Sequence, residues 1–422
     1  MVMANWQQFY KRSWSERVNI LAANQKLTSA EQNLIKENYN HIGEQQVENY
    51  ITNFGVPMGL LLKLPVNGQE VNVPMATEEP SVIAAANNGA RIMRQGVGVQ
   101  TEFSQHLMRG QILLVNVQDI SALSEYVQKN EQLLLKWAND AHPSMAARGG
   151  GAQSILVEIL AEKTVAVNVM VDTKEAMGAN TVNTMAEAVA DKLRQQGYQV
   201  LMAILSNYGT ESLITAKVAI PTAALATKQG LSGTEVAQKI ALASHMETLS
   251  PHRAVTANKG ILNGIEAVVL ASGNDTRAVN AALHAYAAHN GQYQGLVSWQ
   301  VIDDELIGTT TMPLSVGVVG GSIGIVPAVK LNHHIMGQPT AKELASIIVA
   351  TGLAQNLSAL RALVSTGIQA GHMALQAKSL AVQVGAHADE IAPLVAKLNE
   401  APKINATLAS ELLQQLRQEK TN

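Results

Sequence analysis

The sequence has no cysteine, few aromatic residues and almost no excess of charge. Without cysteine, disulfides, thiolate zinc sites and a cysteine nucleophile are excluded, and a reducing cytoplasm suits the chain. The formal net charge is −3 and no basic block stands out, so nucleic acid is not an expected partner. No apolar run approaches the roughly 18 residues that span a bilayer, and residues 1–18 do not resemble a signal peptide. We therefore expect a cytoplasmic protein that makes no membrane contact.

The chain is long enough, at 422 residues, for two or three domains with sizeable cores. Residues 107–206 predict the element order β-α-β-β-α-β, which is the ferredoxin-like arrangement. We therefore expect an α+β fold in which a large mixed α/β domain, residues 1–106 and 207–376, is interrupted by this small domain. Residues 377–422 are more polar and helical, and they predict a C-terminal flap.

The segment 251–280 carries a lysine and an aspartate on either side of an apolar run. Lys259 lies in a predicted Asn-Lys-Gly turn, residues 265–270 predict a buried strand, and Asp275 precedes a helix. If that strand is central, both charges can enter one cleft and form a site for a carbonyl oxygen. A turn lysine and a helix-capping aspartate explain the same spacing, and the spacing alone favours that plainer interpretation.

Two strand–helix or turn–helix junctions also carry candidate ligand contacts. Glu79 comes directly before Pro80 and a helix of small residues, where a carboxylate also complements the helix dipole. The turn at residues 176–180, Ala-Met-Gly-Ala-Asn, lets a phosphate approach backbone N–H groups, although a tight turn alone is the commoner explanation. No GxGxxG sequence follows a strand, so there is no Rossmann fingerprint.

The adjacent pair His333 and His334 is the one feature that suggests a metal ligand. We predict a strand here, on which adjacent side chains point to opposite faces. No third ligand has a suitable spacing, so we expect no metal site.

Four blocks of the sequence, in order, resemble the class II form of 3-hydroxy-3-methylglutaryl-coenzyme A (HMG-CoA) reductase. They are ATEEPSVIAAA at 76–86, EAMGANTVNTMAEAVA at 175–190, NKGILNGI at 258–265 with SGND at 272–275, and GLAQNLSALRALVSTGIQAGHMAL at 352–375. The resemblance runs from about residue 48 to about residue 378. It implies reduction of HMG-CoA to mevalonate and free CoA by two nicotinamide hydrides, in isoprenoid biosynthesis.

The resemblance also implies roles for individual residues. It makes Lys259 the group that stabilises the oxyanion, Glu79 the proton donor to the aldehyde, Asp275 the residue that holds these two, and His372 the proton donor to the CoA thiolate. The implied substrate contacts are Ser81, Arg253, Asn263 and Gln355, with Arg253 as the partner of the free carboxylate. The implied cofactor contacts are Glu175, Met177, Gly178, Asn180, Asn183 and Asn207; the family usually has aspartate at the position of Glu175.

The cofactor prediction depends on the residues before the triple glycine at 149–151. Some family members that prefer NADH carry an aspartate there, which accepts from a ribose hydroxyl and repels a 2′-phosphate. In this chain that position is His142, and Arg148 is available to meet a phosphate, although Asp140 lies just upstream. We therefore expect NADPH, with NADH also possible.

The resemblance further implies a homodimer, with a higher assembly of dimers possible, because the family completes its sites across a subunit interface. Two functions of other classes remain open. A CoA-thioester hydrolase or acyl transferase needs a nucleophile beside an oriented base, and the chain has neither a GxSxG sequence nor a cysteine. In a non-catalytic CoA-ligand-binding protein the four predicted catalytic residues would not converge.

Overall fold

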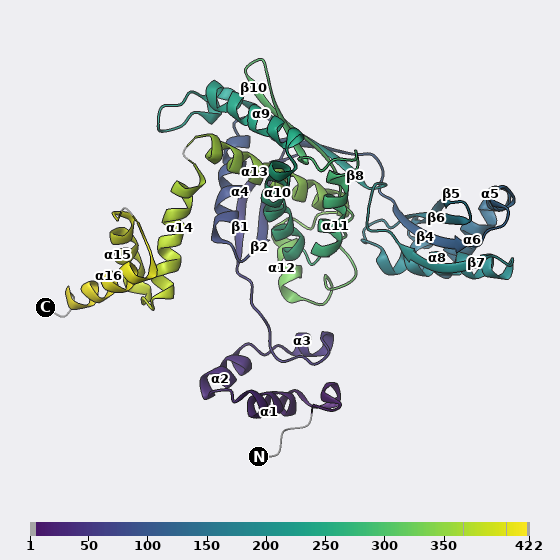
Figure 1. Ribbon diagram of the computed structural model, residues 1–422, viewed down its shortest axis with the longest axis horizontal. Coiled ribbons are helices and arrows are strands. Elements are labelled where there is room, and N and C mark those ends of the chain that lie inside the picture. The colour runs from purple at the N-terminus through teal and green to yellow at the C-terminus, as the bar shows by residue number, and fades with distance from the viewer. Residues whose placement is uncertain (1–5, 366, 402, 420–422) are drawn as a thin grey trace.

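The computed structural model describes residues 6–365, 367–401 and 403–419, with no description of the side chains of 368–375. It shows a central domain from which three smaller units project (Figure 1). These are an N-terminal group of helices, a four-stranded domain and a C-terminal group of helices. Mixed helices and sheets agree with the predicted α+β class.

The central domain is built on a six-stranded sheet with the strand order β2-β1-β3-β8-β10-β9. Its strands are β1 (Met58–Val66), β2 (Gln69–Ala76), β3 (Val99–Phe103), β8 (Leu213–Pro221), β9 (Val297–Ile302) and β10 (Glu305–Pro313). All neighbours pair antiparallel except β1 and β3. Asn67 and Gly68 have φ of 49° and 78°, so they form the left-handed hairpin turn that the sequence predicts.

Four helices form a layer beside this sheet: α4 (Pro80–Met93), α9 (Gly233–Leu249), α10 (Pro251–Ala271) and α13 (Ala341–Val364). α13 packs against the other three. At its crossing with α4, a Cβ on Gly89 would overlap the carbonyl oxygen of Ala354, so only glycine permits this approach. Among the described helices α13 alone is long and apolar enough to cross a membrane, but 72% of its most apolar stretch is buried inside the protein.

Helix α10 replaces the strand that the sequence predicts at 265–270. Ser250 caps it by accepting from the N–H of Arg253, and Pro251 occupies the first turn. The buried residues Ala254, Ala257, Ile261, Ile265 and Val268 recur at helical spacing over the whole segment. A six-residue apolar run fits a strand or a buried helix equally well, and the longer period decides for the helix. Lys259 therefore lies within a helix and not in a turn.

The small unit has its own core and a second, four-stranded antiparallel sheet. Its elements are β4 (Met108–Val115), α5 (Ile120–Lys129), α6 (Glu131–Ala141), α7 (Pro143–Ala147), β5 (Gly151–Ala161), β6 (Thr164–Asp172), α8 (Ala179–Gln195) and β7 (Gln199–Leu205). The strand order is β5-β6-β4-β7. The predicted element order is present, with the first predicted helix divided at Asn130, whose side chain donates to Tyr126 O and ends α5.

The two segments that join the small unit to the central domain run side by side. The N–H of Ser104 donates to Leu213 O at 3.1 Å, and the N–H of Leu107 donates to Glu211 O at 3.2 Å. A third connection comes from beyond β6, where Ala176 forms an isolated parallel bridge with Val319. The entry and exit of the small unit are therefore neighbours in space.

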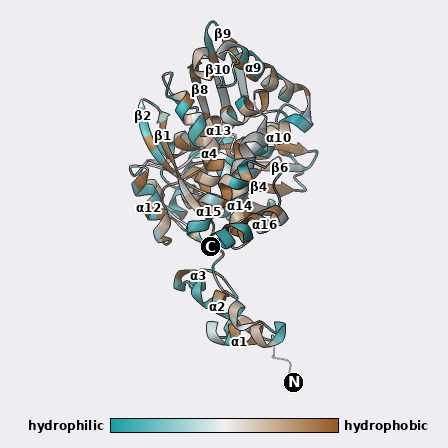
Figure 2. Ribbon diagram, turned by 90° about the vertical axis from the view of Figure 1, so that its left-hand side faces the viewer, coloured by the Kyte–Doolittle hydropathy of each residue, from teal (hydrophilic) through white to brown (hydrophobic). Residues whose placement is uncertain are grey.

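The two ends of the chain form separate helical groups. The N-terminal helices α1 (Trp14–Gln25), α2 (Ser29–Glu37) and α3 (His41–Gln46) lie apart from the central domain in both views (Figure 1 and Figure 2). α2 begins with the predicted capping box of Thr28 and Glu31. The C-terminal helices α14 (Ile368–Gln383), α15 (Ala388–Asn399) and α16 (Ala406–Glu419) share a small core. The domain boundaries stay predictions; the one at 376/377 falls within α14.

Candidate active site

Six of the predicted residues line one cavity of about 470 Å³ between α4, α10 and α13: Glu79, Ser81, Arg253, Lys259, Asn263 and Gln355. Close helix packing brings these three distant segments together. A Cβ on Gly264 of α10 would lie 3.0 Å from the Cβ of Gln355 on α13, tighter than most such contacts. The cavity is therefore formed by the helix crossings, and it brings together two of the four predicted catalytic residues, Glu79 and Lys259.

Glu79 and Lys259 face each other at one edge of this cavity. Glu79 Oε2 lies 3.4 Å from Lys259 Nζ, and Ser81 Oγ donates to Glu79 Oε1. Glu79 is the residue before α4, yet its side chain makes no capping hydrogen bond to that helix. The side chains are 36% and 65% exposed, and ion pairs so exposed contribute about 0–1 kcal/mol to stability. The pair is therefore accessible to a ligand and contributes little to folding.

Asp275 does not join this pair within one chain. It caps α11 (Thr276–Ala287), accepts from the N–H of Ala278 and pairs with Arg277 at 3.0 Å. The hydrogen bond from the Arg277 side chain holds the pKa of Asp275 below its ordinary value. α10 rises about 1.5 Å per residue, so its end at Ala271 is about 18 Å from Lys259. The expectation that both enter one cleft is therefore wrong for a single chain, because Asp275 lies beyond the far end of α10 and is paired with Arg277.

His372 lies in α14, and its side chain is outside the described residues. The helix itself contacts α4 and α13, two walls of the cavity. The predicted contact of His372 with the CoA sulfur stays a prediction.

Glu247, which the sequence analysis did not single out, also lines the cavity. Glu247 is 1% exposed, and neither of its carboxylate oxygens has a hydrogen-bond partner among the described residues. Burial raises its pKa to about 7, against the opposing charge of Arg253. The sequence does indicate that this glutamate is buried, because Glu247 continues the helical spacing of Val236, Ile240 and Ser244 on the buried face of α9.

The predicted cofactor segment lies at the N-terminus of α8. Gly178 precedes that helix with φ of 94°, and a Cβ there would overlap the side chain of Thr173. No side chain caps α8, so its first N–H groups are available to an anion. Arg148 lines an adjoining cavity of about 260 Å³ together with Glu175 and Ala176.

The remaining predicted cofactor residues differ in what they contact. The carboxylate of Glu175 accepts from the N–H of Ala341 at 2.7 Å, at the start of α13. Asn183 accepts from the N–H of Leu205, so it ties α8 to β7. His142 Nε2 lies 3.4 Å from Thr181 Oγ1 in the first turn of α8.

Three further predicted contacts, Met177, Asn180 and Asn207, form no side-chain hydrogen bond within the described part of the chain. Met177 packs against the core of the small unit, whereas Asn180 and Asn207 are exposed. Glu175 and Asn183 thus have structural partners, whereas the exposed side chains of Asn180 and Asn207 are accessible to a ligand.

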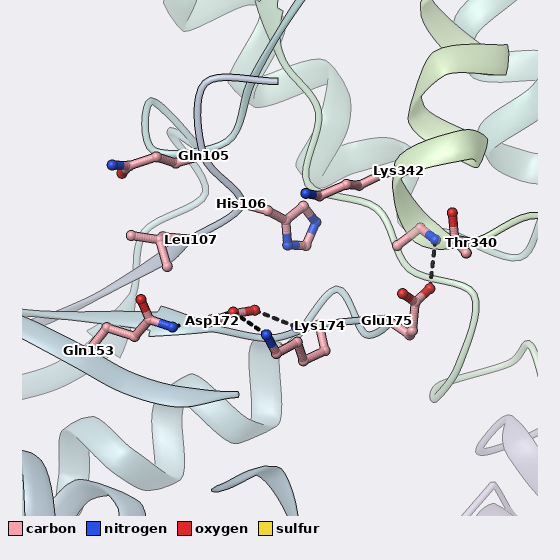
Figure 3. A pocket seen from close by; sticks show the side chains of 10 residues that line it. Gln105, His106, Leu107, Gln153, Asp172, Lys174, Glu175, Thr340 and Lys342 are labelled. Carbon is pink, nitrogen blue, oxygen red and sulfur yellow. Dashed lines mark hydrogen bonds and ion pairs between the residues drawn. The ribbon is translucent and has the colours of Figure 1, made fainter. Parts of the chain in front are cut away.

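A second large cavity, about 510 Å³, lies between the small unit and α13 (Figure 3). Lys174 pairs with Asp172 at 2.8 Å on one side, and His106 and Lys342 point toward the same space from the other. Burial lowers the pKa of His106 below its ordinary value. The described residues contain no group of three or more histidine, aspartate or glutamate side chains that could hold a metal ion. His333 and His334 lie on α12 (Pro327–Ile335), so the predicted strand there is wrong.

Comparison with known proteins gives a consistent result. Residues 13–377 match the model of the family described as hydroxymethylglutaryl-coenzyme A reductase. The 3-hydroxy-3-methylglutaryl-coenzyme A reductase of Archaeoglobus fulgidus is 38% identical over 416 residues, covering 97% of this chain and 94% of the relative. A solved structure of the Streptococcus pneumoniae enzyme is 44% identical with a TM-score of 0.76, covering 98% of this chain and all of that one. A class II structure from the same organism, bound to NADPH in open conformations, is 44% identical with a TM-score of 0.75, covering 96% of this chain and all of that one.

Proposed function

The chain belongs to the hydroxymethylglutaryl-coenzyme A reductase family, and from that premise we propose that the cavity between α4, α10 and α13 holds the acyl group of HMG-CoA during its reduction to mevalonate. The observation that carries this is the convergence of Glu79, Lys259 and Arg253 on one cavity. Arg253 supplies a fixed cation for the free carboxylate of the acyl group. The family is one of NAD(P)H-dependent oxidoreductases, and the hydrolase or acyl-transferase alternative is not favoured.

Lys259 and Glu79 divide the work on the reacting oxygen. When bound, a reduced nicotinamide would provide the hydride for each of the two reductions, and the residues of the cavity handle the oxygen. The Lys259 ammonium is accessible and stabilises the negative charge that develops on the carbonyl oxygen. Glu79 lies 3.4 Å from that ammonium and is placed to give a proton to the aldehyde oxygen. Ser81 holds the other oxygen of Glu79 and so fixes the orientation of the carboxyl group.

NADPH is the cofactor that we propose for the N-terminus of α8. The N–H groups after Gly178 receive a phosphate, and Arg148 provides a cation for the 2′-phosphate. His142 stands at the position where an aspartate would repel that phosphate. Comparing kcat/KM for NADPH and NADH tests this assignment, and a clear preference for NADH would contradict it.

We propose further that two chains share each site as a homodimer in the cytoplasm. Asp275 and Lys259 do not meet within one chain, which supports a site in which Asp275 comes from the partner subunit. The N-terminal helices stand apart from the central domain and leave Phe54 93% exposed, which suits a segment that packs on a second copy.

Mixing two inactive variants tests the shared site. A heterodimer of Lys259→Ala and Asp275→Asn chains contains one intact site if the two residues come from different subunits. Co-refolding equal amounts should then restore about a quarter of the wild-type activity, because half of the dimers are mixed and each has one good site of two. No recovery, in a mixture shown by mass spectrometry to contain heterodimers, would place both residues in one subunit.

The reaction itself is tested by following NADPH absorbance. Oxidation should depend on added HMG-CoA and should consume two NADPH for each CoA released. Release of CoA thiol without NADPH oxidation would instead indicate a hydrolase. Binding of HMG-CoA without either change would indicate a ligand-binding protein.

A further inference from the structure

Glu247 is a buried carboxyl group in the cavity wall that the proposed chemistry does not use. It lies in the last turn of α9, where its residue is 1% exposed and both oxygens lack hydrogen-bond partners among the described residues. Gly295 packs directly against this carboxyl group, and a Cβ there would lie 2.8 Å from Glu247 Oε2. Glycine at 295 therefore makes the space that this carboxyl group occupies. An unpaired buried carboxylate is costly, so the site favours the neutral acid.

Arg253 is the charged group that acts most directly on Glu247. It lines the same cavity from α10, and its positive charge opposes the effect of burial on Glu247. The two groups nevertheless form no ion pair within 4.0 Å among the described contacts. Arg253 and Glu247 thus line one cavity, close enough for the charge of Arg253 to act on Glu247.

The other charged groups near Glu247 are few. Lys259 on α10 and Glu79 before α4 line the same cavity, and they pair with each other. The cavity wall from α13 is uncharged, being formed by Gln355, Asn356, Ser358 and apolar residues, and β9 carries no charged residue. On α9 itself the nearest titratable side chain is His245, which contacts Thr248. Since Glu79 pairs with Lys259, Glu247 is the other carboxyl group among the described residues of this cavity that can compete with a ligand for Arg253.

We propose that Glu247 is a positioning residue that controls whether Arg253 is available to the carboxylate of the acyl substrate. The neutral acid leaves the guanidinium free to bind the substrate. The ionised form attracts the guanidinium to the buried side and repels the substrate anion. This inference rests on the proposed role of Arg253, and it adds a residue that sets when the cavity accepts an anionic acyl chain.

The proposal predicts a pH-dependent affinity for HMG-CoA. Glu247 titrates near pH 7, so the dissociation constant should rise about tenfold between about pH 6 and about pH 8. In the wild type, binding above pH 7 should also take up as much as about one proton, because the substrate carboxylate favours the neutral form of Glu247. Isothermal titration of HMG-CoA, without nicotinamide, in buffers of different ionisation enthalpy measures both quantities. Free CoA, which lacks the acyl carboxylate, is the ligand control.

Three variants separate the possible results. Glu247→Gln resembles the neutral acid, so it should abolish both the tenfold rise and the proton uptake, and KM should show the same change with less effect on kcat. Glu266→Gln, which removes an exposed carboxylate from α10 outside the cavity, should retain both. Gly295→Ala should displace the Glu247 carboxyl group and alter the pH profile.

Each contrary result has a distinct meaning. If Arg253→Gln binds HMG-CoA as tightly as the wild type, the proposed role of Arg253 fails first. If Arg253→Gln weakens binding but Glu247→Gln keeps the wild-type pH profile, only the control by Glu247 is overturned. Wild-type protein that binds HMG-CoA without proton uptake overturns it as well, even if the Glu247→Gln variant does not fold.

Discussion

Removing the ammonium of Lys259 should greatly lower the catalytic rate while hardly changing the stability of the fold. Its pair with Glu79 spans 3.4 Å but is 65% and 36% exposed, so Lys259→Ala should lower the free energy of unfolding by about 1 kcal/mol or less. The same change removes the proposed oxyanion-stabilising group. Loss of such a group costs about 2.7–4 kcal/mol in the transition state, which corresponds to a loss of about 100- to 1000-fold in kcat.

The chain contains a matched control for this substitution. Lys63 Nζ pairs with Glu70 Oε2 at the same 3.4 Å on the β1–β2 hairpin, with side chains 66% and 50% exposed. Lys63→Ala should cost a similar amount of stability and leave the activity near that of the wild type. HMG-CoA-dependent oxidation of NADPH and denaturant unfolding, on the same preparations, give both quantities. Lys259→Ala activity within a few-fold of wild type would falsify the assignment, and a large loss of stability would show that the pair is structural.

Four other substitutions test separate parts of the structure. Asp275→Asn keeps a good helix cap, so it should leave unfolding almost unchanged while activity falls on the order of 100-fold; retained activity would leave Asp275 a capping role only. His372→Gln should impair reduction of the thioester but spare reduction of added mevaldehyde, ideally with CoA present, and equal loss of both activities would contradict thiolate protonation. Gly89→Ala should destabilise the protein by about 1–3 kcal/mol, measured by denaturant unfolding, because α4 must move away from Ala354; an unchanged midpoint would contradict the crossing. Glu247 has its pKa raised from 4.5 to about 7, so wild-type stability should fall by up to about 3 kcal/mol as pH rises through that window, and Glu247→Gln should remove the fall; parallel curves would refute the raised pKa.

Local features of the fold could be predicted because neighbouring residues determine them. The hairpin at Asn67-Gly68 and the capping box at Thr28 each follow from a few adjacent side chains. The run at 265–270 could not be assigned from six residues, since a buried helix and a buried strand are both apolar. Reading the longer period from Ala254 onward would have identified α10.

Only part of the candidate site could be predicted from the sequence. Family motifs identified Lys259 and Glu79, but nothing in either segment showed that they lie 3.4 Å apart, because the packing of α4 and α10 on α13 decides it. The position of Asp275 depends on the direction of α10, which a mistaken strand concealed. Glu247 was missed because a glutamate near the end of a helix is usually solvated, and its burial depends on the space left at Gly295.

The paired connections of the small unit bear on the order in which the chain folds. β3 and β8 are neighbours in the six-stranded sheet, yet the whole small unit separates them in sequence. The ribosome therefore completes the small unit before it makes β8, the strand that pairs with β3. Once the insert has folded, its ends are held together at Ser104–Leu213 and Leu107–Glu211, so the remaining loop that must close is short. A nascent chain stopped just after β7 should accordingly hold a protease-resistant insert while β3 still lacks its partner strand β8.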